Sequence, residues 1–169
     1  VTCNVSKESD IENLVERTEN EFGPIDVFCS NAGIAILGDE HATDDQWQRN
    51  WDIHVMAHIY AARAVAQKMA GRGSGYLVNT SSAAGVLTHI KSATYSVTKH
   101  AAVAFAEFLS ITYGPSGVKV SVLCPQAVNT AMIQGREDDV ASVDGMIEPE
   151  TLADCVIETM EKEEFLILP

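Results

Sequence analysis

The chain has 169 residues, of which 46% are hydrophobic and 21% charged, a composition that predicts one globular domain and excludes a disordered protein. Eleven basic against twenty-four acidic residues give a formal charge of −13, which repels phosphate backbones and argues against nucleic acid as a partner. The apolar runs are short and interrupted, so we expect no membrane span. Four scattered cysteines without metal-ligand or CxxC spacing indicate reduced thiols and a cytoplasmic location.

Helical and strand-like patterns alternate along the chain, beginning with a helix. Apolar residues at helical spacing predict a first helix over residues 9–22, with Ser9 and Glu12 as a capping box. Gly23 and Pro24 mark its end. The next run, IDVFCSNAG, is typical of a buried strand that ends in a polar, glycine-containing turn.

A longer helix is predicted from Thr43 to Met69, with Thr43 and Gln46 suited to its cap. The remaining elements alternate strand and helix: GYLVNTSS, residues 92–113, GVKVSVLCP, residues 148–161 and EFLILP. Strands rich in Val, Ile and Leu between helices favour a doubly wound parallel sheet, a three-layer α/β fold of Rossmann type, as one domain over residues 1–169. The polar residues 134–148 form either a lid or an ordinary surface loop.

Three polar turns follow three of the predicted strands. They are SNAG, NTSS and CPQAVNT, each at the carboxyl end of its strand. Ligands of doubly wound sheets bind beyond the carboxyl ends of the strands. We therefore expect a single site at that edge of the sheet.

Tyr95 and Lys99 are the candidates for chemistry at this site. They are four residues apart at the start of a predicted helix, so their side chains share one face. A phenol ionises near pH 10, and we expect the Lys99 ammonium to lower the pKa of Tyr95 toward the range that acid–base catalysis needs. Ser82 ends the preceding strand and can hydrogen-bond the same reacting oxygen. The set is suited to moving a proton onto or off a carbonyl or alcohol oxygen.

The order and spacing of these motifs resemble the short-chain dehydrogenase/reductase family. Ser82, Tyr95 and Lys99 stand where that family has its catalytic serine, tyrosine and lysine, and SNAG, CPQAVNT and CNV resemble three further motifs of the family, over essentially the whole chain. The resemblance implies an oxidoreductase that uses NAD or NADP to interconvert a small-molecule alcohol and a carbonyl. It implies Tyr95 as general acid/base, Ser82 as the holder of the substrate oxygen, and Lys99 as the partner of the tyrosine and the nicotinamide ribose.

The resemblance also implies a set of cofactor contacts. The NAG turn would pass close to the cofactor, the segment after the third strand would meet the carboxamide, and the CNV residues would line the adenine pocket. In addition to Tyr95 and Lys99, the residues concerned are Asn31, Ala32, Gly33, Pro125, Val128, Thr130, Asn4 and Val5. Helices 43–69 and 92–113 correspond to helices that pair between subunits in the family, so we expect a homodimer or homotetramer.

Several positions depart from the family pattern. His54 stands where the family has a fourth catalytic residue, an asparagine, and an imidazole there can relay protons. His54 and His58 are four apart, but no acidic third ligand is evident nearby, so packing or a subunit contact is favoured over a metal site. Gln126 replaces a glycine, which adds a side chain near the expected substrate, and Ser30 replaces the first asparagine of the family's NNAG motif.

The glycine-rich turn that holds the pyrophosphate in dinucleotide folds is missing from the sequence. We therefore expect the chain to be part of a longer protein, incomplete at its N-terminus, and the abrupt end at EFLILP leaves the C-terminus open as well. The choice between NAD and NADP also stays open. The alternative is a non-catalytic binding or scaffold protein, or an inactive fragment, on the same fold. A hydrolase is disfavoured because the sequence contains neither a GxSxG elbow nor a GxxxxGK[ST] loop.

Overall fold

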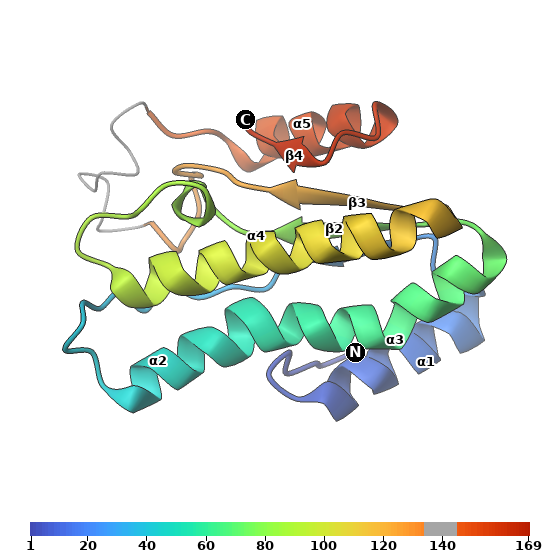
Figure 1. Cartoon of the computed structure of the whole chain (residues 1–169), viewed down its shortest axis with the longest axis horizontal. Helices are drawn as coiled ribbons and strands as arrows, with labels where there is room; N and C mark the ends of the chain where they lie inside the picture. Colours follow the sequence, from blue (N-terminus) through green and yellow to red (C-terminus); the bar gives the residue numbers. More distant parts are fainter. Residues whose placement is uncertain (134–144) are drawn as a thin grey trace.

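A parallel four-stranded sheet is the centre of the fold (Figure 1). The computed structural model describes residues 1–133 and 145–169. The strands are β1 (Val27–Ser30), β2 (Gly75–Thr80), β3 (Val118–Leu123) and β4 (Leu166–Ile167), and they lie side by side in that order. Every neighbouring pair is parallel, as the sequence predicts for strands separated by helices.

The register brings the carboxyl ends of three strands to one edge of the sheet. Ser30 of β1 lies opposite Asn79 of β2, and Thr80 of β2 lies opposite Leu123 of β3. The polar segments that follow these strands are therefore neighbours. Residues 134–144, which make up most of the polar stretch interpreted as a lid or a loop, lie outside the described residues.

Helices connect the strands and cover the sheet. In Figure 1, α4 (Ala93–Tyr113) crosses in front of the strands, α5 (Pro149–Glu161) and β4 lie above it, and α2 (Asp44–Trp51), α3 (Ala57–Arg72) and α1 (Glu8–Phe22) lie below it. The short 3₁₀ turns η2 (Ala83–Gly85) and η3 (Gly114–Ser116) flank α4 in sequence. Buried side chains of α3, α4 and the sheet pack into one core, with Val65, Met69, Leu77, Leu109 and Val122 among its members.

The predicted caps have different outcomes. The Thr43 side chain accepts the backbone N–H of Gln46, whose side chain accepts the Thr43 N–H in return, so this capping box is confirmed. The capping box at Ser9 is wrong. Helix α1 already begins at Glu8, because the Asn4 carbonyl accepts the N–H of Lys7 and closes a turn before it. Ser9 therefore lies inside the first helical turn, where its side chain cannot cap.

The predicted helix from Thr43 to Met69 contains a π-helical segment, η1 (Asp52–Met56), between α2 and α3. A π turn accommodates an extra residue, and such bulges are frequent at functional sites. Three consecutive side chains of the segment, Ile53, His54 and Val55, are buried. An uninterrupted α-helix would turn one of them away from the core.

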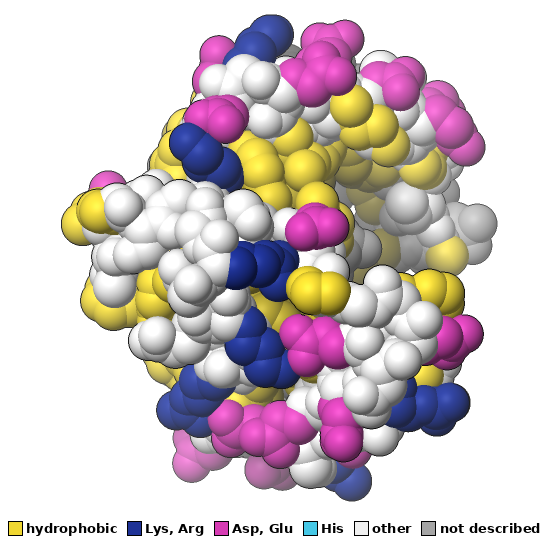
Figure 2. Space-filling view, turned by 90° about the vertical axis from the view of Figure 1, so that its right-hand side faces the viewer, with side chains coloured by type: hydrophobic (Ala, Val, Ile, Leu, Met, Phe, Trp, Pro, Cys, Tyr) yellow, Lys and Arg dark blue, Asp and Glu magenta, His cyan; other side chains and the backbone are white. Residues whose placement is uncertain are grey.

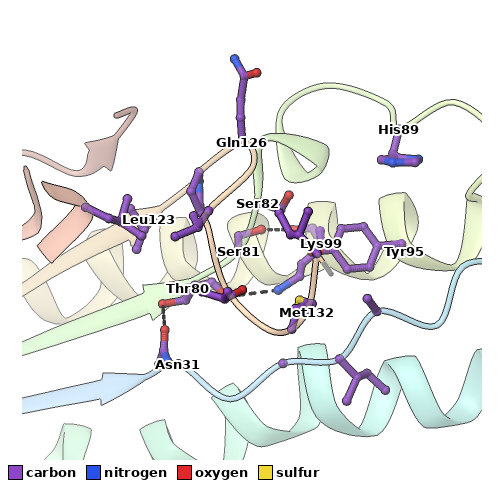
Figure 3. A pocket seen from close by; sticks show the side chains of 18 of the residues that line it. Asn31, Thr80, Ser81, Ser82, His89, Tyr95, Lys99, Leu123, Gln126 and Met132 are labelled. Carbon is purple, nitrogen blue, oxygen red and sulfur yellow. Dashed lines mark hydrogen bonds between the residues drawn. The ribbon is translucent and has the colours of Figure 1, made fainter. Parts of the chain in front are cut away.

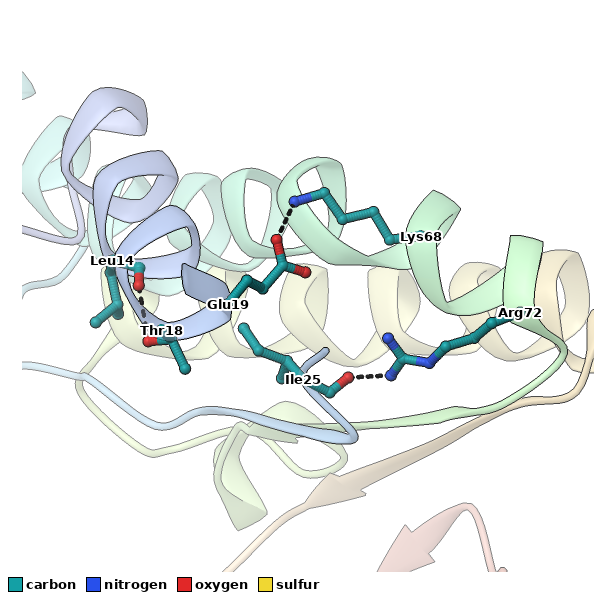
Figure 4. Close-up of polar contacts among 6 residues, drawn as sticks. All are labelled: Leu14, Thr18, Glu19, Ile25, Lys68 and Arg72. Atoms are coloured by element: carbon teal, nitrogen blue, oxygen red, sulfur yellow. Dashed lines mark hydrogen bonds and ion pairs between the residues drawn. The ribbon is translucent and has the colours of Figure 1, made fainter. Parts of the chain in front are cut away.

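Helix α3 is attached to α1 and to the segment before β1 by polar contacts (Figure 4). Lys68 Nζ lies 2.6 Å from the Glu19 carboxylate, and the Arg72 guanidinium donates to the Ile25 carbonyl. Strand β1 forms one edge of the described sheet, and the Val27 side chain there is 46% exposed.

Acidic and apolar side chains share the surface. In Figure 2, acidic side chains lie at the top, where α5 is found in Figure 1, and again at the bottom, with hydrophobic side chains between them. Helix α4 also exposes large apolar side chains, with Phe108 56% and Ile111 72% exposed. Within residues 1–133 and 145–169, none of the helices has the length and apolar character needed to cross a bilayer.

Candidate active site

A cavity of about 370 Å³ opens at the carboxyl ends of β1, β2 and β3. Each of the three polar turns singled out in the sequence contributes to its lining. The residues concerned are Asn31 and Gly33 in the first turn, Thr80, Ser81 and Ser82 in the second, and Pro125, Gln126, Val128 and Thr130 in the third. Tyr95 and Lys99 line it from the first turns of α4. The parallel register is the cause, because it places the ends of neighbouring strands at one edge.

Ser82, Tyr95 and Lys99 come together in this cavity (Figure 3). The Tyr95 phenol is hydrogen-bonded with the Ser82 side chain. Lys99 Nζ lies 5.6 Å from the centroid of the Tyr95 ring and donates to the Thr80 carbonyl oxygen at 3.4 Å. The turn from β2 to α4 is held in place by Ser81, whose hydroxyl donates to the Lys99 carbonyl at 2.9 Å.

Burial governs the ionisation of this pair. It raises the pKa of Tyr95 above 10, and the hydrogen bond with Ser82 opposes the rise. Burial lowers the pKa of Lys99 from 10.5 to about 8. The expectation that Lys99 lowers the pKa of Tyr95 is therefore not met in this structure, because the ammonium lies against the Thr80 carbonyl and burial of the phenol outweighs it.

His54 lies behind the cavity wall and is not part of its lining. Its side chain is fully buried, and its ring meets that of Tyr95 edge-on with the centroids 5.3 Å apart. Nε2 lies 3.0 Å from the Ile34 carbonyl, and Nδ1 lies 2.9 Å from the Thr98 hydroxyl. Burial and the nearby Lys99 charge lower the pKa of His54 from 6.5 to about 3. The imidazole is therefore neutral at physiological pH, with both nitrogens engaged.

The expected cofactor residues divide into two groups. Asn31, Gly33, Pro125, Val128 and Thr130 line the cavity together with Tyr95 and Lys99. Ala32 lies between two lining residues but is not part of the lining itself. A Cβ added at Gly33 would stand 3.8 Å from Lys99 Nζ, so the glycine keeps the space in front of the ammonium open.

Asn4 and Val5 lie apart from the cavity lining, in the turn before α1. The Asn4 side chain accepts hydrogen bonds from the Ser6 N–H and hydroxyl, and the backbone N–H of Asn4 donates to the Asp10 carboxylate. Gln126 borders the cavity, but its side chain is exposed and extends away from Ser82 and Tyr95 in Figure 3.

His89 is a lining residue that the sequence reasoning missed. It lies in the turn between η2 and α4, and its ring centroid is 6.4 Å from that of Tyr95. Its only signal in the sequence is its place between Ser82 and Tyr95, because the chain must leave the sheet edge and return to it over that stretch. The apolar side chains of Leu37, Met132 and Leu152 also line the cavity.

A metal site at His54 and His58 receives no support from the geometry. Among residues 1–133 and 145–169, no group of three His, Cys, Asp or Glu side chains is arranged to hold an ion. His58 is 2% exposed, and burial followed by the Lys99 charge lowers its pKa to about 4. Both imidazoles are therefore neutral core groups.

Known proteins resemble the chain over nearly its whole length. A family model described as short chain dehydrogenase matches residues 1–141. The 1-deoxy-11-beta-hydroxypentalenate dehydrogenase of Streptomyces exfoliatus is 30% identical over 172 residues, which cover 99% of this chain and 62% of that protein. The chain spans between 50% and 62% of the length of eight curated relatives that it matches.

Two solved structures have the same fold. The apo form of LigO from Sphingobium sp. strain SYK-6 is 27% identical with a TM-score of 0.86, over 100% of this chain and 62% of that chain. A short-chain dehydrogenase from Sphingobium yanoikuyae in complex with NADPH is 23% identical with a TM-score of 0.85, over 99% of this chain and 65% of that chain.

Proposed function

Since the chain belongs to the short-chain dehydrogenase family, we propose that the protein is an NAD(P)-dependent oxidoreductase that interconverts an alcohol and a carbonyl. One observation carries the proposal: Ser82, Tyr95 and Lys99 line one cavity together with the turns that follow β1 and β3. The alternative of a non-catalytic scaffold has no observation in its favour among the described residues.

Tyr95 is the proton donor and acceptor in this proposal. In the reducing direction its hydroxyl transfers a proton to the carbonyl oxygen of the substrate, and in the oxidising direction the phenolate takes the proton back. Because burial raises its pKa, the phenol is protonated at neutral pH and ready to donate. Ser82, which hydrogen-bonds the phenol, holds the same substrate oxygen. A bound nicotinamide supplies or accepts the hydride.

Lys99 and its neighbours are suited to hold the cofactor. The lysine is 3% exposed and keeps its proton at pH 7, since its pKa is about 8. Its ammonium is positioned to hydrogen-bond a ribose hydroxyl across the open space at Gly33. We assign the remaining cofactor contacts to Asn31, Ala32, Pro125, Val128 and Thr130, and the adenine contacts to Asn4 and Val5. Titrating the protein with NAD and with NADP decides which of the two it binds.

The substrate occupies the part of the cavity next to Tyr95. The cavity lining includes apolar side chains such as Leu37 and Met132, and His89 is a polar neighbour of Tyr95. We therefore propose a small-molecule alcohol or carbonyl with an apolar body. Gln126 is assigned to the rim, where it can contact substrate only at the cavity mouth.

The proposed function is tested by Tyr95→Phe in the protein expressed from its complete open reading frame. Turnover is expected to fall at least about 100-fold, because the general acid is removed, while NADPH or NADH binding, followed by fluorescence, is retained. Tyr113→Phe is the matched control, since it removes a phenol at the far end of the same helix. Near-normal turnover in Tyr95→Phe would contradict the catalytic assignment.

We also propose a homodimer or homotetramer formed through α4. Its exposed Phe108 and Ile111 form an apolar surface that a second copy can cover. Phe108→Glu should lower the mass measured by analytical ultracentrifugation, and an unchanged mass would exclude α4 from the interface. A cytoplasmic location agrees with four free cysteines, Cys3, Cys29, Cys124 and Cys155, and is checked by cell fractionation.

A further inference from the structure

The segment Ile34–Gly38 is held between two helices by buried polar side chains. It follows the turn after β1 and belongs to no strand. Asn50 and His54 reach it from α2 and η1, and Thr94 reaches it from α4, while Thr98 of α4 contacts His54. The members of each pair are four residues apart, so they share a helix face. All four side chains are fully buried, and we call them the clamp.

The middle of the segment is held through the Ile36 carbonyl. Asn50 Nδ2 donates to this oxygen at 3.0 Å, and Thr94 Oγ1 donates to it from the opposite side at 3.2 Å. The backbone N–H of Thr94 donates to the Gly38 carbonyl at 3.1 Å. A buried carbonyl outside a strand needs such donors, because an unpaired one is costly.

The beginning of the segment is held through His54. Its Nε2 meets the Ile34 carbonyl at 3.0 Å, and its Nδ1 meets Thr98 Oγ1 at 2.9 Å. The Thr98 hydroxyl donates its one proton to the Thr94 carbonyl at 2.8 Å, so it accepts a hydrogen bond from His54 Nδ1, while Nε2 accepts from the Ile34 backbone N–H at 3.3 Å. His54 thus connects the segment to the helical turn of α4 that carries both Tyr95 and Lys99.

The clamp holds Ile34, Ile36 and Gly38 of the segment. Ile34, Ala35 and Leu37 are part of the cavity lining, whereas Ile36 and Gly38 are not. The position of the cavity wall at Ala35 and Leu37 therefore depends on the clamp, and so does its distance from Tyr95.

We propose that Asn50, Thr94 and Thr98, together with His54, are positioning residues that hold the wall formed by Ala35 and Leu37 in register with Tyr95. This inference rests on the proposed function, because the wall matters to catalysis only if substrate reacts at Tyr95. The clamp residues act through the backbone of the segment and through the first turns of α4. None of the four lines the cavity, so they touch neither substrate nor cofactor.

The test removes one clamp hydroxyl and then restores it. Thr98→Val keeps the shape of the side chain and deletes the hydroxyl that meets His54, and Thr98→Ser restores it. Thr18→Val is the matched control, because Thr18 donates to the carbonyl four residues back at 2.8 Å, as Thr98 does, but on α1 away from the cavity. All variants are made in the protein expressed from its complete open reading frame.

Two readouts are compared, and one of them does not depend on turnover. In Thr98→Val, kcat for cyclohexanol or 2-octanol oxidation should fall about tenfold with the cofactor KM unchanged, because a misplaced wall impairs orientation but not cofactor binding. Hydrogen exchange of residues 34–38 should become about tenfold faster. Thr98→Ser should restore both values, and Thr18→Val should leave both at the wild-type level.

The outcomes separate the clamp from the proposed function. If kcat of Thr98→Val equals that of the wild type, the positioning role is overturned, even when residues 34–38 exchange faster. If the wild-type protein neither binds a nicotinamide cofactor nor oxidises either probe, the proposed function fails. The clamp is then judged by exchange alone, and unchanged protection of residues 34–38 overturns it.

Discussion

The buried histidine His58 should make the protein sensitive to mild acid. Its side chain is 2% exposed on α3, and burial followed by the Lys99 charge lowers its pKa from 6.5 to about 4. Between those two values the unfolded chain binds a proton that the folded protein does not. By linkage, the stability contributed by neutral His58 is present above pH 6.5 and is lost progressively as the pH falls toward 4.

The magnitude follows from the width of this window. One pKa unit corresponds to about 1.4 kcal/mol, and pH 5 lies about 1.5 units below the unfolded-state pKa of His58. Protonation of His58 in the unfolded chain alone therefore lowers the unfolding free energy by about 2 kcal/mol at pH 5. Replacing His58 by leucine removes this term. The loss of unfolding free energy between pH 7 and pH 5 should therefore be about 2 kcal/mol smaller in His58→Leu than in the wild type.

Urea unfolding followed by the fluorescence of Trp47 and Trp51 measures this difference at both pH values. His41→Gln is the control, because it removes a histidine whose side chain is 84% exposed. It should keep the wild-type dependence on pH. If His58→Leu loses as much stability as the wild type between pH 7 and pH 5, the inference that His58 is buried in its neutral form is wrong.

Three further perturbations test the helices and the buried cation by denaturant unfolding. Gly117→Ala should lower the unfolding free energy by over about 1 kcal/mol more than Gly23→Ala does. The backbone φ is positive at both residues, +81° at Gly117 and +85° at Gly23, but only at Gly117 would the new Cβ crowd a backbone carbonyl. Equal losses in the two variants would contradict this packing. Lys99→Met should abolish turnover and raise the unfolding free energy at pH 7 by roughly 1–3 kcal/mol. The reason is that burial, which lowers the pKa of Lys99 to about 8, disfavours the charged form that predominates at pH 7. A loss of stability would show that the ammonium is well compensated by its surroundings. Thr43→Ala should lower the unfolding free energy by about 1 kcal/mol because the capping box of α2 is lost, whereas Ser9→Ala should leave it almost unchanged. A larger loss at Ser9 than at Thr43 would show that α1 begins elsewhere.

Much of the fold could be predicted because local patterns carry it. Apolar residues at helical or strand spacing give the positions of the helices and strands, and valine-rich strands between helices give the parallel sheet. The order of Ser82, Tyr95 and Lys99 with the NAG turn is enough to indicate the family. The ends of the elements were harder to predict. The turn closed by the Asn4 carbonyl places the start of α1 at Glu8, one residue before the predicted cap Ser9.

The environment of each site residue could not be predicted in the same way. Sequence spacing places Lys99 one turn from Tyr95, but it does not say that the ammonium points to the Thr80 carbonyl or that burial raises the pKa of the phenol. Likewise, the position of His54 in the family pattern indicated a proton relay. Its engagement with Ile34 and Thr98 depends on a π turn that no local pattern revealed.

By itself the sequence determined the alternation of elements, the parallel sheet, the edge at which the site lies and the identity of the candidate acid, since all of these follow from periodicity and the order of short motifs. Only the tertiary structure decided which groups are neutral and which side chains hold the cavity wall. The reason is physical: burial and contacts such as Thr94 with Ile36 join residues 58 positions apart, and desolvation depends on everything packed around a group rather than on its neighbours in the chain.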